Sequence, residues 1–153
     1  MYTVLIVEDC PITRETLRDC LQAHARISQV LTAPDGIAAT VILHDNRVDF
    51  VLTDLTMPRM DGYELMEHIR RFYPEIPTCV MTVHEQATEK LIKSGALLVL
   101  IKPFSIDEVL NRIIHCIELP KSIHALQEQI DSLQAGIRKH RFSLIRGGKY
   151  HSL

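Results

Sequence analysis

Short apolar runs alternate along the chain with longer segments in which apolar residues recur every three or four positions. The short runs have the length and β-branched content of buried strands, and the longer segments have the period of helices that bury one face. This alternation is typical of an α/β fold built around a parallel sheet. It predicts five strands, each followed by a helix, at Thr3–Val7, Gln29–Ala33, Phe50–Thr53, Thr78–Met81 and Leu97–Ile101.

The ends of the five helices are marked by residues that favour or stop helical turns. Pro11 suits the first turn of the first helix, which we expect to bury Leu17, Cys20 and Leu21. Ser105 can cap the fifth helix, whose apolar stripe is the clearest in the chain. The three helices between them are expected at Gly36–His44, Asp61–Tyr73 and Glu85–Ser94.

Beyond Pro120 the apolar period changes to seven, with a and d positions at Ile123, Leu126, Ile130, Leu133 and Ile137. Isoleucine at a with leucine at d favours a parallel two-stranded coiled coil, so homodimerisation is the simple expectation. The alternative is a helix that folds back onto its own domain, because about three heptads are marginal for a free coiled coil. The predicted organisation is a domain at 1–119, a coiled-coil helix at 120–138 and a basic tail or linker at 139–153.

The formal net charge of -2 hides an uneven distribution. Residues 1–120 hold 11 Lys and Arg against 17 Asp and Glu, whereas residues 121–153 hold 6 against 2. The basic tail has few aromatic residues and no helix-turn-helix pattern, so we expect a solvated tail rather than a nucleic-acid partner. Four widely spaced cysteines, without a secretory leader or a long apolar run, predict mostly buried, reduced thiols in a cytoplasmic protein that does not enter membranes.

Polar residues directly follow four of the predicted strands. Glu8 and Asp9 follow the first, Asp54 the third, Thr82 the fourth and Lys102 the fifth. In an open parallel sheet the ligand site lies outside the carboxyl ends of the strands. Clustered carboxylates repel one another unless a cation joins them, and all-oxygen ligation suits Mg²⁺. A hydroxyl and a lysine beside such a metal suit a phosphoryl group.

These residues resemble the motifs of response-regulator receiver domains across residues 1 to about 119. The resemblance rests on Glu8-Asp9, on Asp54 in Leu-Thr-Asp-Leu-Thr-Met-Pro-Arg-Met-Asp-Gly, on Thr82, and on Gly95-Ala96 and Lys102-Pro103-Phe104. It implies a flavodoxin-like, doubly wound five-stranded parallel sheet of order 2-1-3-4-5 with five helices, to which the chain adds a C-terminal helix.

The resemblance also implies a role for each residue at the predicted site. Asp54 would accept a phosphoryl group from a sensor histidine kinase or phosphotransfer protein. Asp9, Asp54 and the backbone carbonyl of Thr56 would bind Mg²⁺, with Glu8 acting through a metal-bound water. Lys102 would offset charge on the phosphoryl group, and Thr82 would bond its oxygen and pass the change to an unidentified downstream protein.

The chain departs from the family pattern at several positions near this site. Val83 stands where a small residue is usual, and Val99 where the family commonly has an aromatic switch residue. His84 occupies a position at which the family tunes phosphate lifetime. Leu97 and Leu98 replace the usual acidic residues and could mark a dimer or partner surface.

Two other classes of function are alternatives to the receiver. A haloacid-dehalogenase-type phosphatase needs a second aspartate two residues after the nucleophile, and Thr56 occupies that position, which argues against a turnover enzyme. A phosphorylation-independent dimeric scaffold would keep the fold without switching, and Val83 and Val99 would then mark the lost function. The eight histidines show no ligand spacing.

Overall fold

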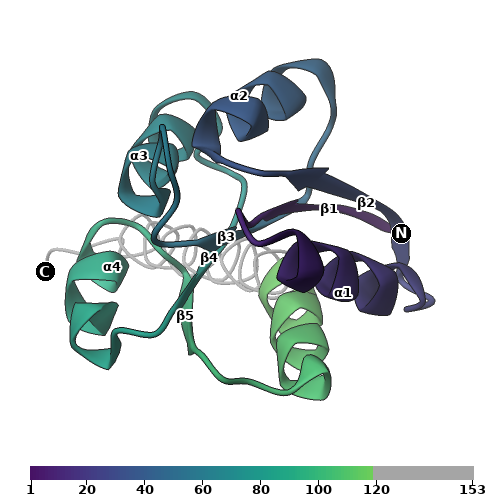
Figure 1. The fold of residues 1–153 in the computed structure, drawn as a ribbon. Coiled ribbons are helices and arrows are strands. Elements are labelled where there is room, and N and C mark those ends of the chain that lie inside the picture. The colour runs from purple at the N-terminus through teal and green to yellow at the C-terminus, as the bar shows by residue number, and fades with distance from the viewer. Residues whose placement is uncertain (119–153) are drawn as a thin grey trace, which may run out of the picture. The chain divides into compact units, whose positions relative to one another are not determined.

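The computed structural model describes residues 1–118 and contains a five-stranded parallel sheet (Figure 1). The order of its strands is β2-β1-β3-β4-β5, as the resemblance implied. Every strand begins and ends within two residues of its predicted position, and β3 and β4 each include one more polar residue at their carboxyl ends. The strands are β1 (Tyr2–Val7), β2 (Ile27–Ala33), β3 (Phe50–Asp54), β4 (Thr78–Thr82) and β5 (Leu98–Ile101).

Helices follow the strands in the predicted alternation. They are α1 (Pro11–Gln22), α2 (Gly36–Asp45), α3 (Gly62–Phe72), α4 (Thr88–Lys93) and a helix that begins at residue 106 and continues to the end of the described residues. The predicted fourth helix is correct in place but not in type, because it opens with the 3-10 turn η1 (Glu85–Ala87). The Ala87 N–H bonds the carbonyl of His84, three residues back, and α-helical geometry starts only at Thr88.

The helices cover both faces of the sheet and create separate apolar clusters. On one face, α1 and the helix at 106–118 pack over the central strands, with Leu17, Leu21 and Ile113 almost fully buried. On the other face, α2 and α3 share one cluster and α4 contributes Leu91 to another (Figure 1). Strand residues 4–7 and 50–52 are 0% exposed, which explains why these strands read as continuous apolar runs.

Side-chain caps fix where three helices begin. Asp35 accepts a hydrogen bond from the Ala38 N–H at the start of α2, and Ser105 accepts one from the Glu108 N–H. Asp61 and Glu64 form a reciprocal capping box at the start of α3. The predicted Ser105 cap is therefore confirmed. Because each cap ends a loop that begins at the carboxyl end of a strand, the caps also shape the loops around that edge of the sheet.

The cysteine prediction is only half right. Cys79 and Cys116 are buried, and burial raises the pKa of both thiols. Cys20 is only partly buried because it lies beside the stripe formed by Leu17 and Leu21, and Cys10 is exposed in the turn before α1.

Residues Met1–Ile117 form one compact unit. No helix in the described part of the chain is long and apolar enough to cross a membrane. The predicted heptad positions and basic tail lie outside the described residues, so the coiled coil and the proposed boundaries stay predictions.

Candidate functional site

Strand register brings the predicted site residues to one edge of the sheet. Val7 pairs with Thr53, so Glu8 and Asp54 leave neighbouring strands side by side. Thr82 pairs with Ile101, so Lys102 follows directly beside it. The loops are held there by backbone bonds, from the Leu55 N–H to the Met81 carbonyl at 2.9 Å and from the Lys102 N–H to the Thr82 carbonyl at 2.8 Å. Four residues that are far apart in the sequence therefore meet at the carboxyl ends of the strands.

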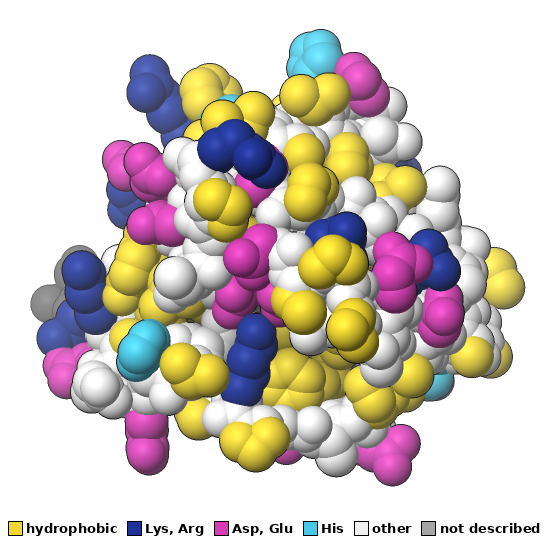
Figure 2. All heavy atoms as spheres, viewed as in Figure 1, with side chains coloured by type: hydrophobic (Ala, Val, Ile, Leu, Met, Phe, Trp, Pro, Cys, Tyr) yellow, Lys and Arg dark blue, Asp and Glu magenta, His cyan; other side chains and the backbone are white. Residues whose placement is uncertain are grey.

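The three carboxylates lie close enough to share a cation. Glu8, Asp9 and Asp54 each offer an oxygen, and these oxygens all lie within 4.8 Å of one another. Glu8 is 2% exposed and Asp54 9% exposed, whereas Asp9 is open to solvent. Figure 2 shows acidic side chains gathered near the middle of this face, with a basic side chain next to them and hydrophobic side chains around. The cluster is thus a partly buried concentration of negative charge at an accessible edge.

Lys102 is the cation that the chain itself supplies to this cluster. Its Nζ lies 3.0 Å from Glu8 Oε2 and 3.2 Å from Asp54 Oδ1. Burial alone would lower the pKa of Lys102, but the bonds and charges of Glu8 and Asp54 outweigh it and hold the pKa above its usual value. One ammonium group therefore bridges two of the three carboxylates, and the acidic charge is in excess.

Burial and the excess of negative charge both shift the pKa values of the carboxylates. Burial raises the pKa of Glu8, against the opposing bonds from Lys102 and the Cys10 N–H, and the charge of Asp54 raises it further. Burial likewise raises the pKa of Asp54, Lys102 opposes it, and the charge of Asp9 adds to the rise. The folded protein thus disfavours full ionisation of its own site, as expected of carboxylates arranged for a cation.

The loop after Asp54 is held against the strand by a glycine. The Gly62 N–H donates to the Leu55 carbonyl at 2.8 Å, and a Cβ at Gly62 would lie 2.6 Å from the Asp54 carbonyl oxygen. Only glycine allows α3 to begin so close to β3. Thr56, the predicted carbonyl ligand, is exposed in this closed loop, two residues after Asp54.

Thr82 lies at the end of β4, with its side chain buried against the site edge. It is 2% exposed, and its Oγ1 accepts a hydrogen bond from the His84 N–H at 3.0 Å. Its own hydroxyl hydrogen can therefore be donated to an oxygen brought to the site. Val83 is 64% exposed and His84 is also exposed, so the two residues after Thr82 both face solvent.

The apolar partner surface predicted near β5 is exposed at only some of its residues, and it gains one residue that was not predicted. Leu97 is 48% exposed, but Leu98 packs against the core beneath α1 and the helix at 106–118. Val99 is partly buried in the cluster that contains Leu91 of α4. Ile101, which the sequence did not single out, is 36% exposed. Alternation along β5 could have indicated this, because successive side chains of a strand point to opposite faces.

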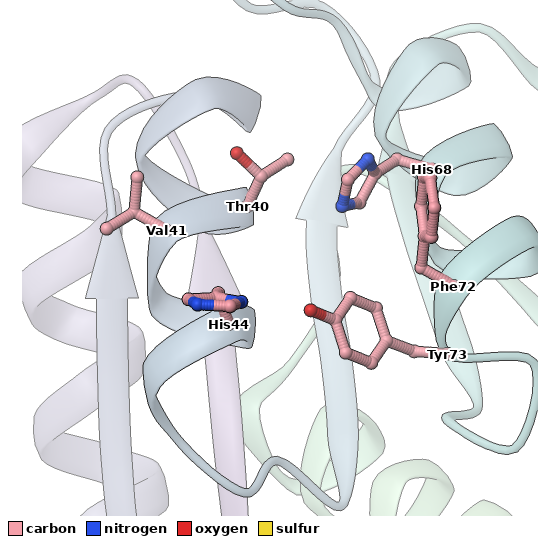
Figure 3. A pocket seen from close by; sticks show the side chains of 6 residues that line it. All are labelled: Thr40, Val41, His44, His68, Phe72 and Tyr73. Carbon is pink, nitrogen blue, oxygen red and sulfur yellow. The ribbon is translucent and has the colours of Figure 1, made fainter.

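A hollow separate from the acidic cluster lies between α2 and α3 and contains none of the acidic residues (Figure 3). It has a volume of about 380 Å³ and is lined by Thr40, Val41, His44, His68, Phe72 and Tyr73. The His68 ring lies 4.8 Å from that of Phe72. This hollow could not be predicted from the sequence, because it forms where α2 and α3 meet, and local sequence patterns do not predict contacts between helices.

Comparison with known proteins agrees with the architecture. A sequence model described as the response regulator receiver domain matches residues 4–114. The sensor histidine kinase RcsC of Escherichia coli (strain K12) is 38% identical over 108 residues, covering 69% of this chain and 11% of that protein. The response regulator MprA of Mycobacterium sp. (strain KMS) is 34% identical over 111 residues, covering 71% of this chain and 47% of that protein.

Solved structures show the same fold. Response regulator protein TrrA of Thermotoga maritima has a TM-score of 0.69 and 26% identity, over 76% of this chain and 99% of that one. The chain thus matches nearly the whole length of a solved receiver, but half or less of the curated relatives. With its sheet order, its strand-end residues and a family match over most of its length, the chain belongs to the response regulator receiver domain family of two-component systems.

Proposed function

We propose that the chain is a phosphoacceptor, with Asp54 taking a phosphoryl group from a phosphohistidine of a sensor histidine kinase or phosphotransfer protein. The observation that carries this proposal is the meeting of Asp54 with two further carboxylates and with Lys102 at 3.2 Å. A buried carboxylate beside a lysine and open on one side is placed to act as a nucleophile. Membership of the receiver family supports the same role.

Mg²⁺ is the metal that this donor set fits. Three carboxylates with one ammonium leave surplus negative charge, and hard oxygen ligands on an open edge suit an ion that keeps part of its water shell. Asp9, Asp54 and the carbonyl of Thr56 would hold the ion, and Glu8 would act through water. When bound, Mg²⁺ supplies positive charge that offsets the charge of a transferring phosphoryl group. TrrA, a structural neighbour, was solved in complex with Mg(2+)-BeF, which supports this assignment.

The transfer needs little more than positioning from the chain's own residues. An Asp54 oxygen forms a bond to phosphorus as the bond from phosphorus to the donor imidazole nitrogen breaks, and that nitrogen leaves with the electron pair. Lys102, already bonded to Asp54 Oδ1, can then bond a phosphoryl oxygen. Thr82 can donate its hydroxyl hydrogen to another. The chain is proposed to assist its own phosphorylation and the later hydrolysis of the acyl phosphate, as a phosphoacceptor and not as a turnover enzyme, because Thr56 stands where a phosphatase would need a second aspartate.

The output is proposed to pass through the surface near Thr82 and through the C-terminal extension. Val83, His84 and Ile101 provide exposed groups at the carboxyl ends of β4 and β5, where a change at Thr82 would be felt by a downstream protein. Leu97 is exposed at the opposite end of β5, where its N–H bonds the Thr78 carbonyl. The heptad residues from Ile123 to Ile137 are proposed to make the full chain a homodimer.

Beryllofluoride, which mimics a bound phosphoryl group, tests the site. We expect it to shift the amide NMR signals of Thr82 and Lys102 in the wild-type protein with Mg²⁺. Asp54→Asn should abolish the shifts, and Glu75→Gln, at an exposed carboxylate outside the site, should leave them unchanged. A wild-type spectrum that does not respond would favour the phosphorylation-independent scaffold.

The dimer is tested separately by sedimentation of the whole chain and of a version that ends at Pro120. We expect a dimer for the former and a monomer for the latter. If both sediment as monomers, the heptad residues do not join two chains.

A further inference from the structure

The loop that follows the proposed phosphorylation site contains an unusual turn at Arg59. The Met60 N–H donates to the Pro58 carbonyl at 2.8 Å, and Arg59 between them has a φ of 68°. Among the described residues it is the one non-glycine residue with a positive φ. A γ-turn of this hand is rare and strained, and arginine has no intrinsic preference for it. Something outside the turn must therefore stabilise it.

The side chain of Arg59 reaches a buried carboxylate in a different loop. Its Nε lies 2.8 Å from Asp35 Oδ2, and a second guanidinium nitrogen bonds the same oxygen. The Asp35 side chain is 4% exposed, although that of Arg59 is 58% exposed. Most exposed ion pairs stabilise little, but here one partner is buried and the guanidinium bonds it through two nitrogens.

Asp35 is itself held in place by the helix that it caps. Its Oδ1 accepts the Ala38 N–H at 2.8 Å, and this bond, with that from Arg59, lowers the pKa of Asp35. The next residue adds a second link between the loops, because the Gly36 N–H donates to the Met60 carbonyl at 3.2 Å. A Cβ at Gly36 would lie 2.5 Å from Met60 Cγ, so the two loops are in close contact.

These contacts hold the tip of the loop at 55–61, which contains Thr56. The base of this loop is closed by the hydrogen bond from the Gly62 N–H to the Leu55 carbonyl. We propose that Asp35 and Arg59 are a positioning pair that holds this loop so that its backbone can bind the metal next to Asp54. The inference rests on the proposed function, since it assigns the pair a task only if Mg²⁺ binds there. Neither residue would touch the ion or the phosphoryl group.

Matched variants separate positioning from general stability. Asp35→Asn keeps an oxygen for the Ala38 N–H but removes the charge that Arg59 binds. Arg59→Ala loses the pair and keeps the strained φ, whereas Arg59→Gly loses the pair at a residue that adopts positive φ readily. Lys93→Ala is the control, because it removes an exposed ion pair with Glu89 elsewhere in the chain.

Calorimetric titration with Mg²⁺ measures the Kd of each folded protein. Loss of residues that orient metal ligands commonly weakens binding tenfold or more, and for this more remote pair we expect a Kd raised about three- to tenfold in Asp35→Asn. Arg59→Ala should be affected more than Arg59→Gly, and Lys93→Ala not at all. A lower melting temperature with an unchanged Kd would overturn the proposal, because it would show a structural role only.

Amide hydrogen exchange gives a readout that does not depend on metal. In metal-free protein, Asp35→Asn should speed exchange at Gly36 and Met60 relative to Tyr73, whose N–H bonds the Ile69 carbonyl at the far end of α3. Unchanged exchange at both amides would show that the pair does not hold the loop. If wild type binds no Mg²⁺ and Asp35→Asn still speeds exchange at these amides, the metal assignment is refuted, and with it the positioning role.

Discussion

The charged side chain of Asp54 is expected to destabilise the folded protein when no metal is bound. The pKa of Asp54 and that of Glu8 both lie above their ordinary values, which means that the folded state penalises their charges. Neutralising one carboxylate should relieve that penalty. We therefore predict that Asp54→Asn is more stable than the wild-type protein when Mg²⁺ is absent, although it is inactive.

The magnitude follows from distances at the site. Two carboxylate charges at 4.8 Å, the upper limit of the separations here, repel by about 3.5 kcal/mol at an effective dielectric of about 20, and Asp54 has two such neighbours. The attraction between Asp54 and Lys102, whose Nζ is 3.2 Å away, offsets this repulsion by about 5 kcal/mol at the same dielectric. The net penalty is about 2 kcal/mol, and screening of the exposed Asp9 reduces it to about 1 kcal/mol.

Urea unfolding followed by circular dichroism measures this difference with EDTA and with Mg²⁺. With EDTA, Asp54→Asn should gain about 1 kcal/mol over wild type, and Glu75→Gln should match wild type. At a Mg²⁺ concentration about ten times Kd, wild type should gain about 1.4 kcal/mol and the variant much less. The reasoning would be refuted if the variant were less stable in EDTA, or if Mg²⁺ stabilised both proteins equally.

Three further predictions concern the same edge of the sheet. Lys102→Ala should lower the free energy of unfolding in EDTA by about 1–3 kcal/mol, measured in urea, because Glu8 would stay buried without its cation; no loss would contradict the ion pairing. Gly62→Ala should lower the free energy of unfolding by about 2 kcal/mol in thermal melts, because the added Cβ would meet the Asp54 backbone. Gly36→Ala, whose Cβ would face the flexible Met60 side chain, should lower it less, and equal losses would be inconsistent with the close approach of Gly62 to Asp54. Folding raises the pKa values of Glu8 and Asp54, so protonation of these two carboxyls should stabilise the metal-free wild-type protein. This stabilisation should be complete below the unfolded pKa of about 4 and be lost as the pH rises through the folded pKa values. The free energy of unfolding of Asp54→Asn should therefore depend less on pH than that of wild type.

The strands and the strand-end residues could be predicted from the sequence because both depend on local pattern. Buried parallel strands give continuous apolar runs, and residues directly after them must emerge at one edge, so Asp54, Thr82 and Lys102 could be placed together without coordinates. The order of the strands came from the family resemblance, since no local pattern contains it.

Features that depend on contact between distant loops could not be predicted. Asp35 reads as an ordinary helix cap, and nothing about Arg59 signals a left-handed backbone, which glycine or asparagine would have suggested. Their pairing appears only when β2 and β3 lie on either side of β1, so that the loops that follow β2 and β3 meet. The partial burial of Cys20 and the packing of Leu98 likewise depend on helix rotation and strand facing, which a residue's hydrophobicity does not specify.

Peptide mapping by mass spectrometry after incubation with acetyl phosphate and Mg²⁺ tests the central claim most directly. The protein should gain one acid-labile phosphoryl group, located on the peptide that contains Asp54, and gain none with EDTA or in Asp54→Asn. A protein that stays unmodified, or one that carries the group on another residue, would contradict the assignment of Asp54 as the phosphoacceptor.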